Sequence, residues 1–128
     1  MQHDADLHDY SILLAEDELL ISRFLCQILE RAGAQVTPVR RVSEVVDLAE
    51  MKFDGALLDV SLEDGDVFPA AELLAEKGVP VVFHSGHDQP SKRMKEGCVA
   101  ASLDKPAMAD EIIRTLVDCI SNKGERAA

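Results

Sequence analysis

The feature that most constrains the fold of this chain is a regular alternation between short apolar runs and segments of helical periodicity. The apolar runs have the length of buried strands and lie at residues 12–15, 35–39, 56–60, 81–83 and 99–103. Helical segments follow them, at about 18–32, from 43, and at 66–77, 91–96 and 107–122. Strands that alternate with helices take right-handed crossovers, which make the strands parallel. The sequence therefore predicts an α/β fold, a doubly wound five-stranded parallel sheet with helices on both faces.

Polar residues stand where four of the five predicted strands end. The second strand has none, which fits a place at the edge of the sheet. Because the carboxyl ends of parallel strands meet at one edge, where such sheets bind ligands, we expect these side chains to converge. The residues at the strand ends are Glu16 and Asp17, Asp59, Ser85, and Asp104 with Lys105.

Carboxylates brought together in this way need positive charge. At an effective dielectric of about 20, two carboxylates near 4 Å repel each other by up to roughly 4 kcal/mol. Lys105 supplies one positive charge, and a divalent cation would supply the rest. Mg²⁺ prefers oxygen ligands and completes its shell with water and phosphate. An aspartate beside such charges can accept a phosphoryl group, and the Ser85 hydroxyl can bind one of the phosphoryl oxygens.

Charge and length restrict the remaining function classes. With 24 acidic and 13 basic residues, a net charge of -11 argues against binding nucleic acid or an anionic membrane. No apolar run approaches the roughly 18 residues of a spanning helix, and the acidic start is unlike a signal peptide, so we expect a cytoplasmic protein. The 128 residues fit one domain, predicted at 10–122 between an acidic tail at 1–9 and a C-terminal tail at 123–128.

The order of the polar strand ends resembles the response-regulator receiver domain of two-component signalling, single-domain type. That family carries an acidic pair, an Asp, a Ser or Thr, and Lys-Pro after the first, third, fourth and fifth strands. The matching residues here are Glu16-Asp17, Asp59, Ser85 and Lys105-Pro106, and the resemblance covers residues 10–121. It implies the flavodoxin-like (βα)5 receiver fold.

The resemblance also implies a role for each matching residue around the phosphoacceptor. Asp59 would take a phosphoryl group from a phosphohistidine on a sensor histidine kinase or a histidine phosphotransfer protein. Lys105 would neutralise the acyl phosphate, with a cis bond to Pro106, while Ser85 would move toward the phosphoryl group and Gly86 would leave room beside it. The Mg²⁺ ligands would be Glu16, Asp17, Asp59 and the backbone carbonyl of Ser61.

Four further residues bear on the predicted site and core. Glu16 replaces the commoner Asp of the acidic pair, and Ser102 stands where the family usually has a Tyr or Phe that reports phosphorylation. His87 lies two positions after Ser85, where the family often tunes the lifetime of the acyl phosphate, or else it is solvated and inert. His84 has the opposite side-chain parity to Ser85 and is expected to pack in the core, as are the apolar stripes of the first and last helices.

The sequence thus predicts a stand-alone response regulator, not an enzyme beyond its own phosphorylation and dephosphorylation. It would signal through contacts with an unknown downstream protein, and an exposed face around the fourth and fifth strands is compatible with a homodimer. One alternative is a receiver-like adaptor that works without phosphorylation, motivated by Ser102 and Glu16. The other is a small Mg²⁺-dependent phosphohydrolase, although Asp59 lacks a second Asp two positions on.

Overall fold

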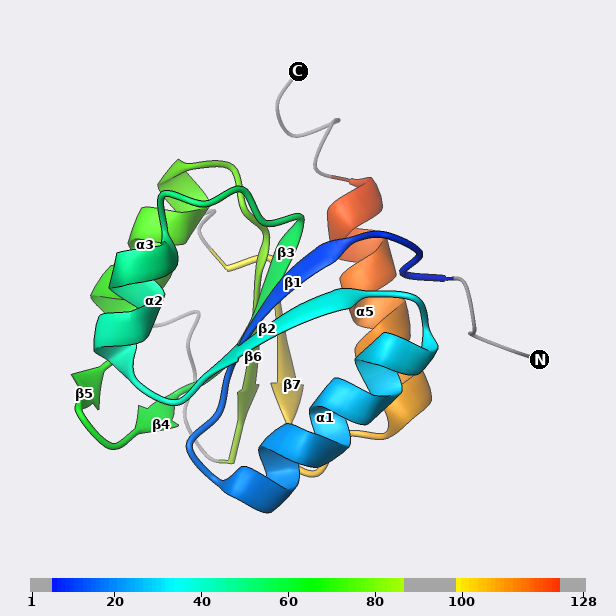
Figure 1. The fold of residues 1–128 in the computed structure, drawn as a ribbon, viewed down its shortest axis with the longest axis horizontal. Coiled ribbons are helices and arrows are strands. Elements are labelled where there is room, and N and C mark those ends of the chain that lie inside the picture. The colour runs from blue at the N-terminus through cyan, green and yellow to red at the C-terminus, as the bar shows by residue number, and fades with distance from the viewer. Residues whose placement is uncertain (1–5, 87–98, 123–128) are drawn as a thin grey trace.

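In the computed structural model, which describes residues 6–86 and 99–122, the strands form the predicted five-stranded parallel sheet (Figure 1). Their order is β2-β1-β3-β6-β7, with every neighbouring pair parallel. The second strand lies at an edge, as the sequence predicts. The strand bounds are Ser11–Ala15 (β1), Gln35–Val39 (β2), Gly55–Asp59 (β3), Val81–Ser85 (β6) and Ala101–Asp104 (β7).

Helices cover both faces of this sheet, which confirms the doubly wound α/β architecture. Helices α1 and α5 lie on one face, and α2 and α3 lie on the other (Figure 1). The predicted helix at 91–96 falls outside the described residues. No helix in the described part of the chain is long and apolar enough to cross a bilayer. The helix bounds are Leu19–Arg31 (α1), Val42–Leu48 (α2), Phe68–Glu76 (α3) and Ala109–Ser121 (α5).

The sheet separates two hydrophobic cores. Alternate strand residues point to opposite faces, so Leu58 and Phe83 join the core under α2 and α3 while Leu57 and Val82 join the core under α1 and α5. The ring of Phe83 meets that of Phe68 on α3, with their centroids 5.5 Å apart. Because strands β3 and β6 are covered on both faces, their sequences read as continuous apolar runs rather than as alternating ones.

The described part of the predicted N-terminal tail packs on the end of α1. Leu7 is fully buried, and its backbone N–H donates to the carbonyl of Ala32 at 2.8 Å. At Gly33, φ is +99° and a Cβ would lie 2.8 Å from the Cα of His8, so the close approach of the two segments requires glycine. The domain boundaries at residues 10 and 122 stay predictions.

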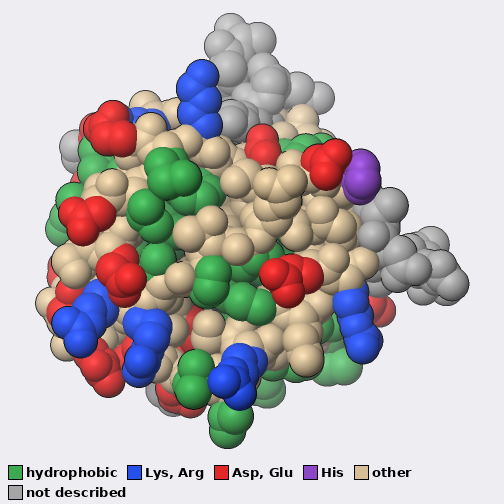
Figure 2. All heavy atoms as spheres, viewed as in Figure 1, with side chains coloured by type: hydrophobic (Ala, Val, Ile, Leu, Met, Phe, Trp, Pro, Cys, Tyr) green, Lys and Arg blue, Asp and Glu red, His purple; other side chains and the backbone are tan. Residues whose placement is uncertain are grey.

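The prediction that the whole apolar stripe of α1 packs in the core is wrong, because part of this apolar surface is exposed. The buried residues of α1 are Ser22, Leu25 and Leu29, whereas Leu20 is 79% exposed and Phe24 is 49% exposed. Each residue advances a helix by about 100°, so Phe24 lies well to the side of Leu25. Figure 2 shows hydrophobic side chains at the lower end of the molecule, where α1 begins in Figure 1. The apolar stripe of α5, by contrast, is buried as predicted.

A small antiparallel hairpin follows β3, the strand that ends in Asp59. Its strands, β4 (Ser61–Leu62) and β5 (Gly65–Asp66), pair Ser61 with Asp66 and Leu62 with Gly65. Gly65 has φ +138°, a backbone conformation that favours glycine. The sequence predicts only an acidic loop here, and the structure shows that this loop is internally hydrogen-bonded.

Candidate functional site

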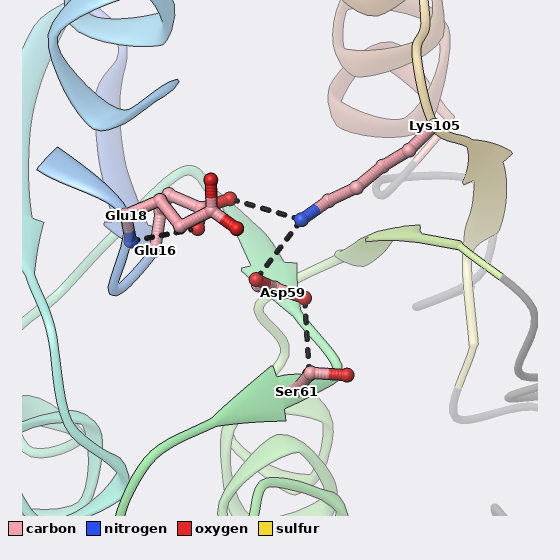
Figure 3. Close-up of polar contacts among 5 residues, drawn as sticks. All are labelled: Glu16, Glu18, Asp59, Ser61 and Lys105. Atoms are coloured by element: carbon pink, nitrogen blue, oxygen red, sulfur yellow. Dashed lines mark hydrogen bonds and ion pairs between the residues drawn. The ribbon is translucent and has the colours of Figure 1, made fainter. Parts of the chain in front are cut away.

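Three strand ends meet at the carboxyl edge of the sheet. Glu16 directly follows β1, Asp59 is the last residue of β3, and Lys105 directly follows β7. Strand β6 lies between β3 and β7, so the Lys105 side chain reaches across the end of β6 (Figure 3). Its Nζ atom lies 3.0 Å from Oδ2 of Asp59 and 3.2 Å from Oε1 of Glu16. The structure therefore places one ammonium group between two carboxylates.

Asp17 completes an acidic cluster with Glu16 and Asp59. One carboxylate oxygen from each residue lies within 4.8 Å of the others. Glu16 is 1% exposed and Asp59 is 5% exposed, and Asp17 is half-buried. A set of three carboxylates with only oxygen donors suits a hard cation such as Mg²⁺, so the residues present fit the expected metal.

Backbone amides hold both buried carboxylates in place. The N–H of Glu18 donates to Oε2 of Glu16 at 3.0 Å, and the N–H of Ser61 donates to Oδ1 of Asp59 at 3.0 Å. Each bond spans two residues, which is the local turn that Asp and related side chains make with their own backbone. Each carboxylate thus uses one oxygen for a backbone amide and the other for Lys105 (Figure 3).

Burial and charge shift the protonation of this cluster. Burial raises the pKa of Glu16 to about 7, and the neighbouring charge of Asp59 acts in the same direction, against the Glu18 N–H and Lys105. Burial alone would lower the pKa of Lys105, but its hydrogen bond and charge interaction with Asp59, together with Glu16, raise it instead. Lys105 therefore stays positively charged. Glu16 holds its proton more readily than an ordinary carboxyl, and a second cation bound beside it would favour the ionised form.

The remaining predicted site residues around Asp59 lie at the same edge of the sheet. Ser85 ends β6 with 1% exposure, and its carbonyl accepts the backbone N–H of Lys105 at 2.8 Å. Gly86 is exposed, and a Cβ there would meet no atom of the described chain within 4 Å. The peptide bond between Lys105 and Pro106 is cis.

Two predicted modulators and one packing residue complete the comparison with the sequence. Ser102 is exposed on β7, and His87 falls outside the described residues. His84 is 6% exposed, and neither ring nitrogen has a hydrogen-bond partner within the described chain. Burial, and then the charge of Lys105, lower the pKa of His84, so the buried ring is neutral.

Asp64 is a structural contact that sequence reasoning missed. It lies in the turn of the β4–β5 hairpin, and its carboxylate accepts the N–H of Val42 at 2.7 Å and that of Ser43 at 3.2 Å. These amides begin α2, 22 and 21 residues earlier in the chain. An acidic residue beside Gly65 indicates a turn, but nothing in the sequence points to a partner so far away.

Comparison with known proteins links this geometry to one family. The chain matches the response regulator receiver domain model over residues 12–117. It is 34% identical over 82 residues to the swarming motility regulation protein RssB of Serratia marcescens, covering 62% of this chain and 37% of RssB. It is 26% identical over 127 residues to the sensory/regulatory protein RpfC of Xanthomonas campestris pv. campestris, covering 92% of this chain and 18% of RpfC. The chain thus spans well under half the length of either relative.

Solved structures share the fold over nearly the whole chain. A response regulator receiver protein from Sinorhizobium medicae superposes with a TM-score of 0.82 at 23% identity, covering 91% of this chain and 98% of its own. The non-phosphorylated HemR receiver domain from Leptospira biflexa gives 0.77 at 28% identity, covering 88% and 95%. The receiver domain of the sensor histidine kinase PA1611 from Pseudomonas aeruginosa gives 0.78 at 24% identity, covering 88% and 98%. Its structure holds a magnesium ion in the active-site cleft.

Proposed function

Since this chain belongs to the response regulator receiver domain family, we propose that it accepts a phosphoryl group on Asp59 from a phosphohistidine donor and signals through protein contacts. The observation that carries the proposal is the Lys105 ammonium held between Asp59 and Glu16, at 3.0 and 3.2 Å. A positive charge in that place compensates the charge that a phosphoryl group brings to Asp59. The donor would be a sensor histidine kinase or a histidine phosphotransfer protein.

The transfer is a single displacement at phosphorus. A carboxylate oxygen of Asp59 forms the new P–O bond while the P–N bond of the donor breaks. The electron pair of that bond passes to the imidazole nitrogen, and the ring leaves as neutral histidine because its other nitrogen carries a proton in the reacting phosphohistidine. No proton has to be removed from Asp59, since it reacts as a carboxylate. The ammonium group of Lys105 compensates the charge of the phosphoryl group, and the hydroxyl of Ser85 donates a hydrogen bond to a phosphoryl oxygen.

Mg²⁺ is the cofactor of this proposal. Its ligands on the protein would be Glu16, Asp17, Asp59 and the carbonyl of Ser61, and when bound it neutralises charge on the transferring phosphoryl group. The three carboxylates within 4.8 Å of one another support this assignment, as does the magnesium ion held by the related PA1611 receiver domain. Because the pKa of Glu16 is raised, Mg²⁺ binding has to displace a proton from Glu16, which lowers the net affinity of the site for the cation.

Exposed apolar side chains at the start of α1 and α5 offer the donor protein a contact surface beside the site. Leu20 and Phe24 stand on the first turns of α1, and Met108, just before α5, is 75% exposed. Large apolar side chains that cluster at the surface often mark a contact with another protein. We place the donor on this surface, which lies next to Glu16 and Lys105 in the chain.

Intact mass spectrometry after incubation with acetyl phosphate, with and without Mg²⁺, tests the proposal. We expect a single phosphoryl adduct on the wild-type protein that requires Mg²⁺ and is lost in Asp59→Asn. Asp47→Asn, an exposed substitution on α2, is the matched control and should be labelled like the wild type. An adduct that persists in Asp59→Asn would refute the assignment. So would a wild-type protein that stays unlabelled both by acetyl phosphate and by a phosphorylated histidine phosphotransfer protein, a result that favours the phosphorylation-independent adaptor.

A further inference from the structure

The hairpin that follows Asp59 is tied to the phosphoacceptor at one end. The N–H of Ser61 donates to Oδ1 of Asp59 at 3.0 Å. Ser61 pairs across the hairpin with Asp66, and Oδ1 of Asp66 accepts the N–H of Phe68 at 2.9 Å, at the start of α3. The six residues from 61 to 66 are thus connected by hydrogen bonds from the phosphoacceptor to the next helix, and we expect them to move together.

The turn of the same hairpin is tied to α2. The first N–H groups of a helix have no partner inside the helix, and a side chain just before the helix usually accepts one of them. In α2, Arg41 stands at that position without a capping hydrogen bond in the described structure. Asp64 takes its place, with 2.7 Å to the N–H of Val42 and 3.2 Å to that of Ser43. The hydrogen bond from Val42 lowers the pKa of Asp64, so the contact persists at neutral pH.

We propose that Asp64 is a positioning residue that couples the state of Asp59 to the start of α2. This inference rests on the proposed function and extends it to a route of communication. Through Asp64, α2 fixes the hairpin and with it the N–H of Ser61 on Asp59. Through the same contacts, a change at Asp59 reaches the first turn of α2.

The change at Asp59 follows from the charge of its carboxylate. In the acyl phosphate the negative charge has moved out to the phosphoryl oxygens, and the carboxyl oxygens of Asp59 are neutral. A hydrogen bond to a charged acceptor is roughly twice as strong as one to a neutral acceptor, so the hold of Asp59 on Ser61 weakens. The hairpin then shifts, and the contact of Asp64 with Val42 and Ser43 shifts with it.

This route does not pass through the β7 position where receiver domains usually carry an aromatic residue. Ser102 on β7 has no large side chain to rotate, whereas both ends of the hairpin route, from Asp59 to Ser61 and from Asp64 to α2, are hydrogen bonds of 3.2 Å or less. The coupling therefore does not require an aromatic switch.

Amide hydrogen exchange measured by NMR tests the forward direction. Mg²⁺ with beryllofluoride, a non-covalent mimic of the phosphoryl group, is added to the wild-type protein, and Mg²⁺ alone is the reference. We expect exchange at Val42 and Ser43 to change about fivefold or more, the size of a modest allosteric coupling. In Asp64→Ala the two amides should exchange fast in both conditions and lose the response.

Titration with Mg²⁺ alone, followed by calorimetry, tests the reverse direction. Coupling is reciprocal, so Asp64→Ala should weaken Mg²⁺ binding about fivefold, and Asp64→Asn, which keeps one carbonyl acceptor, should recover part of the loss. Glu63→Gln removes a carboxylate from the same turn and is the matched control, because Glu63 makes no hydrogen bond or ion pair within the described residues. A purely structural role would lower thermal stability and leave the Mg²⁺ affinity at the wild-type value.

The two levels of the proposal fail in different ways. If Asp64→Ala binds Mg²⁺ like the wild type and beryllofluoride leaves the Val42 and Ser43 amides unchanged, the coupling is refuted while the phosphoacceptor assignment stands. If the wild-type protein neither binds Mg²⁺ nor gains an adduct on Asp59, the proposed function fails and the coupling fails with it.

Discussion

Glu16 is subject to opposing influences within one side chain. It is buried beside a second carboxylate, and it also accepts hydrogen bonds from Lys105 and from the Glu18 backbone. Burial and the charge of Asp59 outweigh the two hydrogen bonds and raise the pKa of Glu16 from 4.5 to about 7. In the absence of a metal ion, the folded protein therefore binds a proton at Glu16 over a pH range in which the unfolded chain does not.

This difference predicts an unusual dependence of stability on pH. In metal-free buffer, the contribution of Glu16 is fully present below pH 4.5 and is lost as pH rises to about 7. The loss is at most about 3 kcal/mol of unfolding free energy. Urea unfolding at several pH values should show a slope that Glu16→Gln removes and that saturating Mg²⁺ reduces. An identical slope in the wild type and in Glu16→Gln would contradict the raised pKa.

His84 contributes to the same pH profile with the opposite sign. Its pKa is lowered from 6.5, so its contribution is full above pH 6.5 and is lost as pH falls below that value. The charged groups that act on it are Lys105 just after β7, Asp59 on β3 and Glu111 on α5. The unfolding free energy of Glu16→Gln should therefore rise as pH rises toward 6.5.

The unpartnered ring of His84 makes a further prediction. A buried polar group without a hydrogen-bond partner costs about 1–3 kcal/mol, so His84→Leu should raise the unfolding free energy by about 1 kcal/mol at neutral pH. His84→Gln keeps polar atoms in the same place and should bring no such gain. Urea unfolding measures both, and a His84→Leu variant less stable than the wild type would show that the imidazole has a partner.

Single residues differ in how far the sequence could predict them. Glu16, Asp59 and Lys105 each follow a recognisable strand, and the carboxyl ends of parallel strands share an edge, so their convergence could be predicted. The contact of Asp64 with α2 could not, because it depends on how two segments 22 residues apart meet in space. The missing partner of His84 was likewise invisible, because parity indicates burial but not hydrogen bonding.

At the scale of elements, α1 has two apolar faces. Leu25 and Leu29 are buried one turn apart, and Leu20 and Phe24 form an exposed pair with the same spacing. Periodicity identifies an apolar stripe but does not identify its edges when two stripes are adjacent. Helical spacing alone therefore predicts core positions for both pairs.

Substitutions on the two faces of α1 should therefore differ in cost. Leu25→Ala creates a cavity in the core and should lower the unfolding free energy by about 2–5 kcal/mol. Leu20→Ala removes an exposed side chain and should change the unfolding free energy by no more than about 0.5 kcal/mol. Chemical denaturation of the two variants checks the assignment, and equal losses would mean that Leu20 is also buried.

Short elements were the hardest to predict. The strands of the β4–β5 hairpin have two residues each, which is too short for any hydrophobic period to appear. Asp66 stands just before α3, and its carboxylate accepts the N–H of Phe68 at the start of that helix. Chemistry at helix ends is local and can be predicted, whereas pairing within a loop depends on the fold around it.

At the scale of the whole molecule, alternation of strands and helices was sufficient to predict the fold class. The polar second strand was assigned to an edge, and the observed order β2-β1-β3-β6-β7 places it there. The net charge of the chain is -11, and on the face that Figure 2 shows, acidic and basic side chains are interspersed. Composition thus predicts which classes of partner are unfavourable, while the position of charge at the strand ends supports a function.

The sheet also separates two cores whose sequences can vary independently of each other. The core under α2 and α3 and the core under α1 and α5 share no side chain, because each strand residue points to one face only. Sequence drift on one side therefore leaves the packing of the other side intact. A lineage can adapt the outer surface of one pair of helices to a new partner while the strand ends keep their chemistry.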